Sequence, residues 1–247
     1  MDFQRGMWAE AWVQSIVALR IVLLVVFGEL AIQLSMEWFE VPRSVVFTTA
    51  GSFASTLLWA YLAYAIHAQI LLPLDRSSFT DGARVFGFAL RSLGIATIVS
   101  LATVLVTFTL AILIGGMVFI YPFLAFLVLG FPLFVWLGTI LPAYVAGRGR
   151  GVDAAIERGK AQFGWIAGRL LVGPVLLFVL SISLYLLLPL PSDGSNLFWS
   201  AEWDFQPVAV LGYLLFNTVQ AFVTSLTAVI LSRAFIRAEG MPDTAAA

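Results

Sequence analysis

Residues 93–114 read LGIATIVSLATVLVTFTLAILI and contain no charged side chain. A helix of about 20 apolar residues crosses the roughly 30 Å of hydrocarbon in a bilayer, so this stretch is long enough to span a membrane. The rest of the chain has the same character: of 247 residues, 61% are hydrophobic and 11% are charged. A soluble domain carries about 25% charged residues. A soluble enzyme and a disordered chain are therefore excluded, and the sequence predicts an integral membrane protein.

Six apolar stretches of helical length occur along the chain. The predicted spans are about 21–39, 45–72, 93–114, 117–146, 166–190 and 208–231. We therefore expect an all-α, polytopic integral membrane helix bundle of six transmembrane helices, forming a single integral membrane domain over residues 1–247. The chain has no cysteine, which excludes disulfides, thiolate catalysis and iron–sulfur ligation.

The basic residues orient these spans. With the N-terminus in the cytoplasm, Arg43 is the only one of the 13 Lys and Arg residues that falls outside. The others are Arg5, Arg20, Arg76, Arg84, Arg91, Arg148, Arg150, Arg158, Lys160, Arg169, Arg233 and Arg237. Basic residues gather on the cytoplasmic side of membrane proteins, so this split predicts that both termini are cytoplasmic.

Three of the inside segments share one plan: a short amphipathic stretch, then a spanning helix. The amphipathic stretches are Phe3–Arg20, Phe79–Arg91 and Val152–Arg169. Aromatic residues at headgroup level with basic residues on the wet side are typical of helices that lie in the interface. We expect three parallel hairpins, each preceded by a short interfacial helix. The alternative is that any even-numbered bundle with cytoplasmic ends repeats in this way.

Two ionisable residues fall inside predicted spans. Glu29 lies nine residues past Arg20, or about 13 Å into the bilayer. His67, the only histidine, lies near the cytoplasmic end of the second span. If the first two spans form a hairpin, Glu29 and His67 can pair as a proton-handling or gating element. The alternative is that each side chain packs against a hydroxyl or a backbone carbonyl.

Amides and prolines mark two other spans. Asn217 and Gln220 lie in the sixth span, where an amide needs a hydrogen-bond partner. Small and hydroxyl residues accompany them at helical spacing, which favours close helix packing over a permeation path. Pro122, Pro132 and Pro142 recur in the fourth span, and each removes a backbone hydrogen bond and bends a helix. Broken helices are common at transporter binding sites, and they also shape ordinary bundles.

The inside loop between the fourth and fifth spans is the most basic part of the chain. Its candidates for contact with lipid headgroups are Arg148, Arg150, Arg158, Lys160 and Arg169. Each basic residue near an anionic membrane surface contributes about 1 kcal/mol of binding. The alternative is that these charges only set the topology. The outside loop at 191–207 is rich in aromatic residues, typical of an interfacial belt or of a docking surface for another subunit.

Residues Leu141–Leu170 read LPAYVAGRGRGVDAAIERGKAQFGWIAGRL. This segment resembles the signature loop of six-span bacterial membrane proteins. That group includes the YciC-like proteins and the membrane domain attached to some glycerophosphodiester phosphodiesterases. The matching positions are Leu141, Pro142, Ala143, Ala154, Ala155, Arg158 and Arg169. The group's usual Arg-Ser step is Arg158–Gly159 here. The resemblance implies a bacterial cytoplasmic (inner) membrane and a membrane module without the phosphodiesterase chemistry, which belongs to a separate soluble domain.

We therefore expect a non-catalytic membrane protein concerned with envelope maintenance or lipid interaction. Its expected partners are membrane lipids. We expect no nucleic-acid partner, no cofactor and no metal. Phosphate-binding, zinc-protease and serine-hydrolase motifs do not occur in the sequence. One alternative is a small transporter or channel that uses Glu29, His67 and the proline-rich fourth span. Another is an accessory subunit of a larger membrane protein complex.

Overall fold

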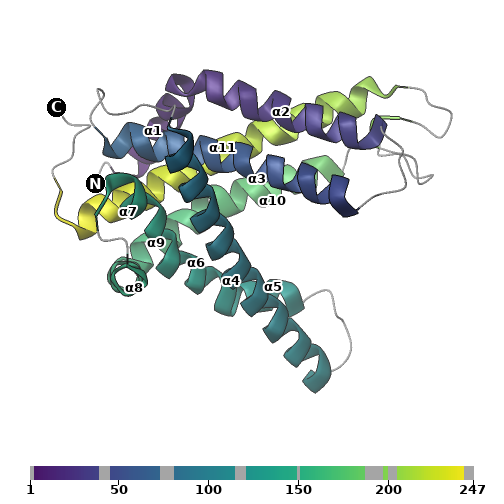
Figure 1. Cartoon of the computed structure of the whole chain (residues 1–247). Helices are drawn as coiled ribbons and strands as arrows, with labels where there is room; N and C mark the ends of the chain where they lie inside the picture. Colours follow the sequence, from purple (N-terminus) through teal and green to yellow (C-terminus); the bar gives the residue numbers. More distant parts are fainter. Residues whose placement is uncertain are drawn as a thin grey trace. The chain divides into compact units, whose positions relative to one another are not determined.

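The computed structural model describes residues 3–38, 45–72, 81–114, 121–148, 151–186, 197–199 and 205–241. Nearly all of these residues are helical, and one isolated antiparallel bridge joins Trp199 to Phe205. Figure 1 shows the helices, coloured along the sequence from purple at the N-terminus to yellow at the C-terminus. The prediction of an all-α protein is confirmed for this part of the chain.

Five helical segments among the described residues are long and apolar enough to cross a membrane. They are Leu19–Trp38, Gly82–Leu113, Tyr121–Ala146, Phe163–Ser183 and Pro207–Ala238. Each overlaps one of the predicted spans, so the prediction of a membrane protein is supported at this level. The predicted second span is not among the five.

Helix α3, Val45–Leu71, occupies that predicted second span. Averaged over its whole length α3 is as apolar as α4, Gly82–Ile114, although it carries hydroxyl groups at Ser52 and Thr56 and polar side chains at His67 and Gln69. The helix is buried on nearly every side from Leu62 to Leu71.

The contacts of the chain group into two compact units. Unit 1 contains Met1–Ile66 and Leu170–Val229, and unit 2 contains His67–Arg169 and Ile230–Ala247. Helices α3 and α11, Pro207–Ala238, each contribute residues to both units. The single domain expected from the sequence stays a prediction.

Unit 1 begins with α1, Phe3–Val17, and α2, Leu19–Trp38, which are separated by a turn at Ala18. This break agrees with the predicted amphipathic stretch before the first span. The rings of Trp8 and Trp12 lie 6.0 and 6.1 Å from Phe222 of α11, so α1 packs against α11.

The other helices of unit 1 approach one another at glycines. Gly28 of α2 faces Leu58 of α3, and Gly51 of α3 faces Met36 of α2. Glycine has no side chain, so the two helices can pack closely at these positions, which is the usual basis of association in lipid.

The π-helical turn η2, Leu171–Val175, contains Pro174 and leads into α10, Leu176–Leu186.

Unit 2 is organised around α4, Gly82–Ile114. The helix packs along the described part of the predicted fourth span, residues 121–146. This part is divided into α5, Tyr121–Ala125, the π-helical turn η1, Phe126–Gly130, α6, Phe131–Gly138, and α7, Ile140–Ala146. Two further helices, α8, Val152–Ala161, and α9, Phe163–Leu170, follow. In Figure 1, α4 and α5 lie side by side.

Helix α4 differs from the expected amphipathic helix followed by a separate span. It runs unbroken from Gly82 to Ile114, and no proline occurs within it. Asp81 caps its start: the carboxylate accepts a hydrogen bond from the Arg84 backbone N–H at 3.2 Å and pairs with the Arg84 side chain at 3.0 Å. The separate interfacial helix predicted over Phe79–Arg91 is therefore wrong for the described residues 82–91.

The prolines explain the divided fourth span. Pro132 has no N–H to donate. The π-helical turn η1 ends two residues earlier, at Gly130, and shifts the backbone bonding so that the Phe131 N–H bonds Phe126 O. A second break lies at Thr139, where ψ is −7°. Gly147 then ends α7 in the left-handed conformation at φ 73°, which glycine adopts without strain.

Helix α8 packs against α6 at one glycine. A Cβ added at Gly159 would lie 2.9 Å from the carbonyl oxygen of Trp136 and 3.0 Å from that of Val135. Backbone atoms cannot rotate away as a flexible side chain can, so α8 must move if this position carries a side chain.

We predict that Gly159→Ala lowers the free energy of unfolding by about 1–3 kcal/mol, the usual cost of overpacking. Gly94→Ala is the matched control. Gly94 lies inside α4, and apart from its own helix backbone no atom of the described residues lies within 4 Å of the added Cβ. The control should be unchanged or gain up to about 1 kcal/mol from helix propensity. Thermal unfolding in mild detergent measures both, and equal stability of the two variants would contradict the packing.

Candidate functional site

The two ionisable residues of the predicted spans have different surroundings. Glu29 lies in α2 with 6% of its surface exposed, and its Oε1 has no hydrogen-bond partner among the described residues. His67 Nδ1 lies 2.7 Å from Ser232 Oγ, and its ring packs against Phe88 at 5.6 Å. Glu29 belongs to unit 1 and His67 to unit 2, so their pairing stays a prediction. His67 instead has the internal hydroxyl partner that the alternative interpretation expects.

Both amides of the sixth span have partners within unit 1. Asn217 Nδ2 donates a hydrogen bond to the Tyr213 carbonyl of its own helix at 2.9 Å. Gln220 Nε2 donates to Ser181 Oγ at 2.9 Å, and that hydroxyl donates to the Phe178 carbonyl at 2.8 Å. The Gln220 amide therefore joins α11 to α10, as expected for an amide that stabilises helix packing.

One end of unit 1 carries an aromatic cluster fixed by one carboxylate. Glu37 is buried, and its Oε2 accepts a hydrogen bond from the Phe198 backbone N–H at 2.9 Å. The ring of Trp199 lies 5.4 Å from that of Trp38 and 5.3 Å from that of Phe205. This role of Glu37 was not predicted from the sequence, because its partner lies 161 residues away.

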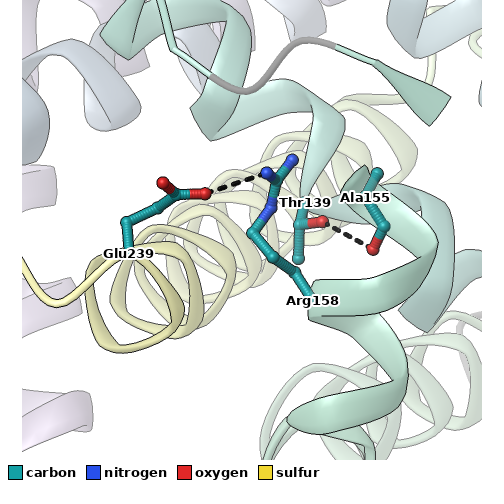
Figure 2. A network of polar contacts seen from close by, with 4 residues as sticks. All are labelled: Thr139, Ala155, Arg158 and Glu239. Carbon is teal, nitrogen blue, oxygen red and sulfur yellow. Dashed lines mark hydrogen bonds and ion pairs between the residues drawn. The ribbon is translucent and has the colours of Figure 1, made fainter. Parts of the chain in front are cut away.

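Arg158 is the most enclosed of the basic residues proposed to contact headgroups. Its exposed fraction is 7%, and its guanidinium bonds Glu239 Oε1 at 3.0 Å and lies over the ring of Phe235 at 5.2 Å. Figure 2 shows Arg158 on α8 reaching toward Glu239 at the end of the α11 helix. Its guanidinium therefore joins two segments of unit 2 rather than facing outward.

A second bond in Figure 2 holds the same region together. The Thr139 hydroxyl, at the break between α6 and α7, donates to the Ala155 carbonyl of α8 at 3.3 Å. Thr139 and Ala155 are both completely buried. The break at Thr139 thus provides an anchor for α8.

Four other basic side chains of unit 2 lie over aromatic rings, and we call these residues the basic–aromatic set. Arg91 lies 4.0 Å from the Tyr144 ring, and Lys160 lies 5.7 Å from the Trp136 ring. The other contacts join Trp165 to Arg169 at 4.1 Å and to Arg237 at 5.1 Å. A cation over an aromatic ring gains about 0.5–2 kcal/mol, depending on its exposure.

The set was only partly predictable. Lys160 and Arg169 are candidates from the sequence, and Arg169 follows Trp165 by one helical turn. Arg91 and Arg237 were missed as headgroup candidates, since Tyr144 and Trp165 are far from them along the chain. Arg148 is exposed at the end of α7, and Arg150 lies outside the described residues.

The chemistry available to this set is anion binding. Arg91, Lys160 and Arg237 are exposed, whereas Arg169 and the three aromatic residues are half-buried. Within the described part of the chain, no group of three or more His, Cys, Asp or Glu side chains is placed to hold a metal ion. Charged heads on long apolar stems beside aromatic rings are typical of a membrane interface.

Comparisons with models of protein families, with curated proteins and with solved structures found no match. The resemblance of Leu141–Leu170 to the loop of YciC-like proteins therefore stays a prediction. Functional conclusions rest on the geometry of the two units.

We predict that Glu239→Gln lowers the free energy of unfolding by about 1–3 kcal/mol, because a nearly buried guanidinium loses a charged partner. The value is below the roughly 3–5 kcal/mol of a fully buried pair because the Glu239 side chain is 31% exposed. Thermal unfolding in detergent measures the loss.

Arg84→Gln is the matched control for this experiment. It removes the ion pair between Arg84 and Asp81, whose side chains are 58% and 39% exposed, respectively. The free energy of unfolding should change by less than about 0.5 kcal/mol. An equal effect of Glu239→Gln and Arg84→Gln would show that the Arg158–Glu239 pair contributes no more than a surface pair.

Proposed function

We propose that the chain is a non-catalytic protein of the bacterial cytoplasmic membrane whose cytoplasmic end binds anionic lipid headgroups. The observation that carries this proposal is the basic–aromatic set: four basic side chains of unit 2 lie over aromatic rings. All four are among the residues that the charge pattern assigns to the cytoplasmic side. Basic residues beside aromatic rings are suited to the boundary between headgroups and acyl chains.

The proposed topology has six spans with both termini in the cytoplasm. Helix α3 is the second span along the chain and is added to the five apolar segments described above. Five helical segments of the described residues are long and apolar enough to span a membrane. A topology with six spans places nearly all basic residues on one side of the membrane. Because α3 is largely enclosed from Leu62 to Leu71, neighbouring helices can shield its polar residues from lipid.

Lipid binding is favoured over transport by the partners of the polar residues. His67, Asn217 and Gln220 each make a hydrogen bond inside the protein. These bonds serve helix packing and give no support to a polar pathway. Lipid binding is favoured over a subunit role because the basic–aromatic set presents charge, whereas the centre of a protein interface is depleted in charged residues.

We predict that residues 44 and 77 lie on opposite sides of the membrane, because α3 separates them. Ser44→Cys and Ser77→Cys each introduce the only thiol into a chain without cysteine. In intact cells a membrane-impermeant maleimide should label position 44 and should label position 77 only after permeabilisation. Labelling of both positions in intact cells would contradict the six-span topology.

We also predict that phosphatidylglycerol binds more tightly than phosphatidylcholine to the delipidated protein, and that added salt weakens this preference. Replacing Arg91 and Lys160 together by Gln should remove about 2 kcal/mol, or about 30-fold in affinity. Native mass spectrometry of the detergent-solubilised protein measures the bound lipid.

Arg84→Gln serves as the control, since Arg84 is exposed but already paired with Asp81. It should retain most of the preference for phosphatidylglycerol. Equal affinity of the unaltered protein for the two lipids would refute the proposed function.

A further inference from the structure

Two guanidinium groups of unit 2 meet at one indole ring. Trp165 lies in α9, Arg169 follows it by one helical turn, and Arg237 comes from the end of α11. The Cζ atoms of Arg169 and Arg237 lie 4.1 and 5.1 Å from the centre of the Trp165 ring. The two cations are therefore no farther apart than the sum of those distances.

Neither guanidinium has a carboxylate partner within the described ranges of the chain. Arg169 Nη1 instead donates a long hydrogen bond of 3.4 Å to the Trp165 carbonyl, within its own helix. Two like charges held close together repel each other, and an anion placed between them removes that repulsion. By contrast, Arg158 of the same loop pairs with Glu239 at 3.0 Å.

The same cluster contains two N–H donors that lack an acceptor. Trp165 Nε1 and Arg169 Nε are both buried, and neither has a hydrogen-bond partner among the described residues. Buried donors in proteins are normally satisfied, because leaving one without an acceptor is unfavourable. Arg237 is exposed, so an acceptor from outside the protein can reach this cluster from the side of Arg237.

We propose that Trp165, Arg169 and Arg237 form a binding site for the phosphate group of one anionic phospholipid. A phosphate oxygen accepts hydrogen bonds from a guanidinium in the fork geometry that arginine favours, and another oxygen accepts from the indole N–H. The single negative charge of the phosphodiester lowers the repulsion between the two guanidinium groups.

The location favours a lipid over a free phosphate ion. Trp165 and Arg169 lie in the first part of Phe163–Ser183, one of the five segments apolar enough to span a membrane. The start of a spanning helix that carries basic residues lies at the depth of the headgroups. This inference rests on the proposed lipid-binding function and names one site and one ligand class for it.

The test uses the full chain, delipidated in mild detergent, with phosphatidylglycerol and phosphatidylcholine as probes in native mass spectrometry. We expect one phosphatidylglycerol to bind at saturation more tightly than phosphatidylcholine, whose choline cation is repelled by the arginines. R169Q/R237Q should weaken phosphatidylglycerol binding by about 30-fold, from about 1 kcal/mol for each charge. R84Q should leave it unchanged.

Two further variants keep the test independent of folding. R169K/R237K retains both charges but loses the fork geometry, so its affinity should fall between those of the unaltered protein and R169Q/R237Q. W165F retains an aromatic ring but removes the indole N–H, and its affinity should also fall. Elution as a single species in gel filtration and an unchanged unfolding temperature identify the variants that remain folded.

The outcomes separate this site from the general function. A folded R169Q/R237Q that keeps the full preference for phosphatidylglycerol would overturn the site but not the proposed function. No preference in the unaltered protein would overturn both. Millimolar inorganic phosphate should not displace the lipid. Displacement by phosphate in a protein that binds both lipids equally would instead assign the cluster to free phosphate and overturn the lipid assignment.

Discussion

The bilayer core offers no hydrogen bonds to a polar group, so a polar group inside a membrane-spanning protein is stable where it finds a partner within the protein. With 11% charged residues, the chain has few charges, and several of its polar and charged side chains find partners over long sequence distances. Glu37 accepts from the Phe198 backbone, His67 bonds Ser232, and Arg158 bonds Glu239. Each bond ties the end of one helix to a segment that is distant in sequence, and these ties set the packing of both units.

The same constraint explains the form of the broken helices. A proline inside a spanning helix leaves a carbonyl without its usual donor, which is costly in lipid. The π-helical turn η1 ends two residues before Pro132, and η2 contains Pro174. In both places the backbone changes its bonding pattern rather than leaving the helix, so a span can continue past the proline. These turns therefore serve the packing of the bundle, whether or not they also form part of a binding site.

Hydropathy and charge were enough to predict the helical class and the approximate bounds of most spans, because both depend on residues close together in sequence. The first span was expected at 21–39, and α2 is Leu19–Trp38. The unbroken α4 was missed because an amphipathic stretch looks the same whether or not the helix continues beyond it. The enclosure of α3 was also missed, since burial depends on neighbours that hydropathy does not identify.

Arg158 and Arg169 show why candidate sites are harder to predict than spans. Both lie in one basic loop, and the sequence assigned both of them to headgroup contact. The difference between them lies at the end of α11, where Glu239 meets Arg158 and Arg237 meets Trp165 beside Arg169. One arginine thus acquires an internal counter-charge, and the other acquires a second positive charge. An arginine with an internal partner stabilises the fold, whereas two arginines beside unsatisfied donors need an anion from outside. Only the second arrangement favours the binding of an anionic lipid.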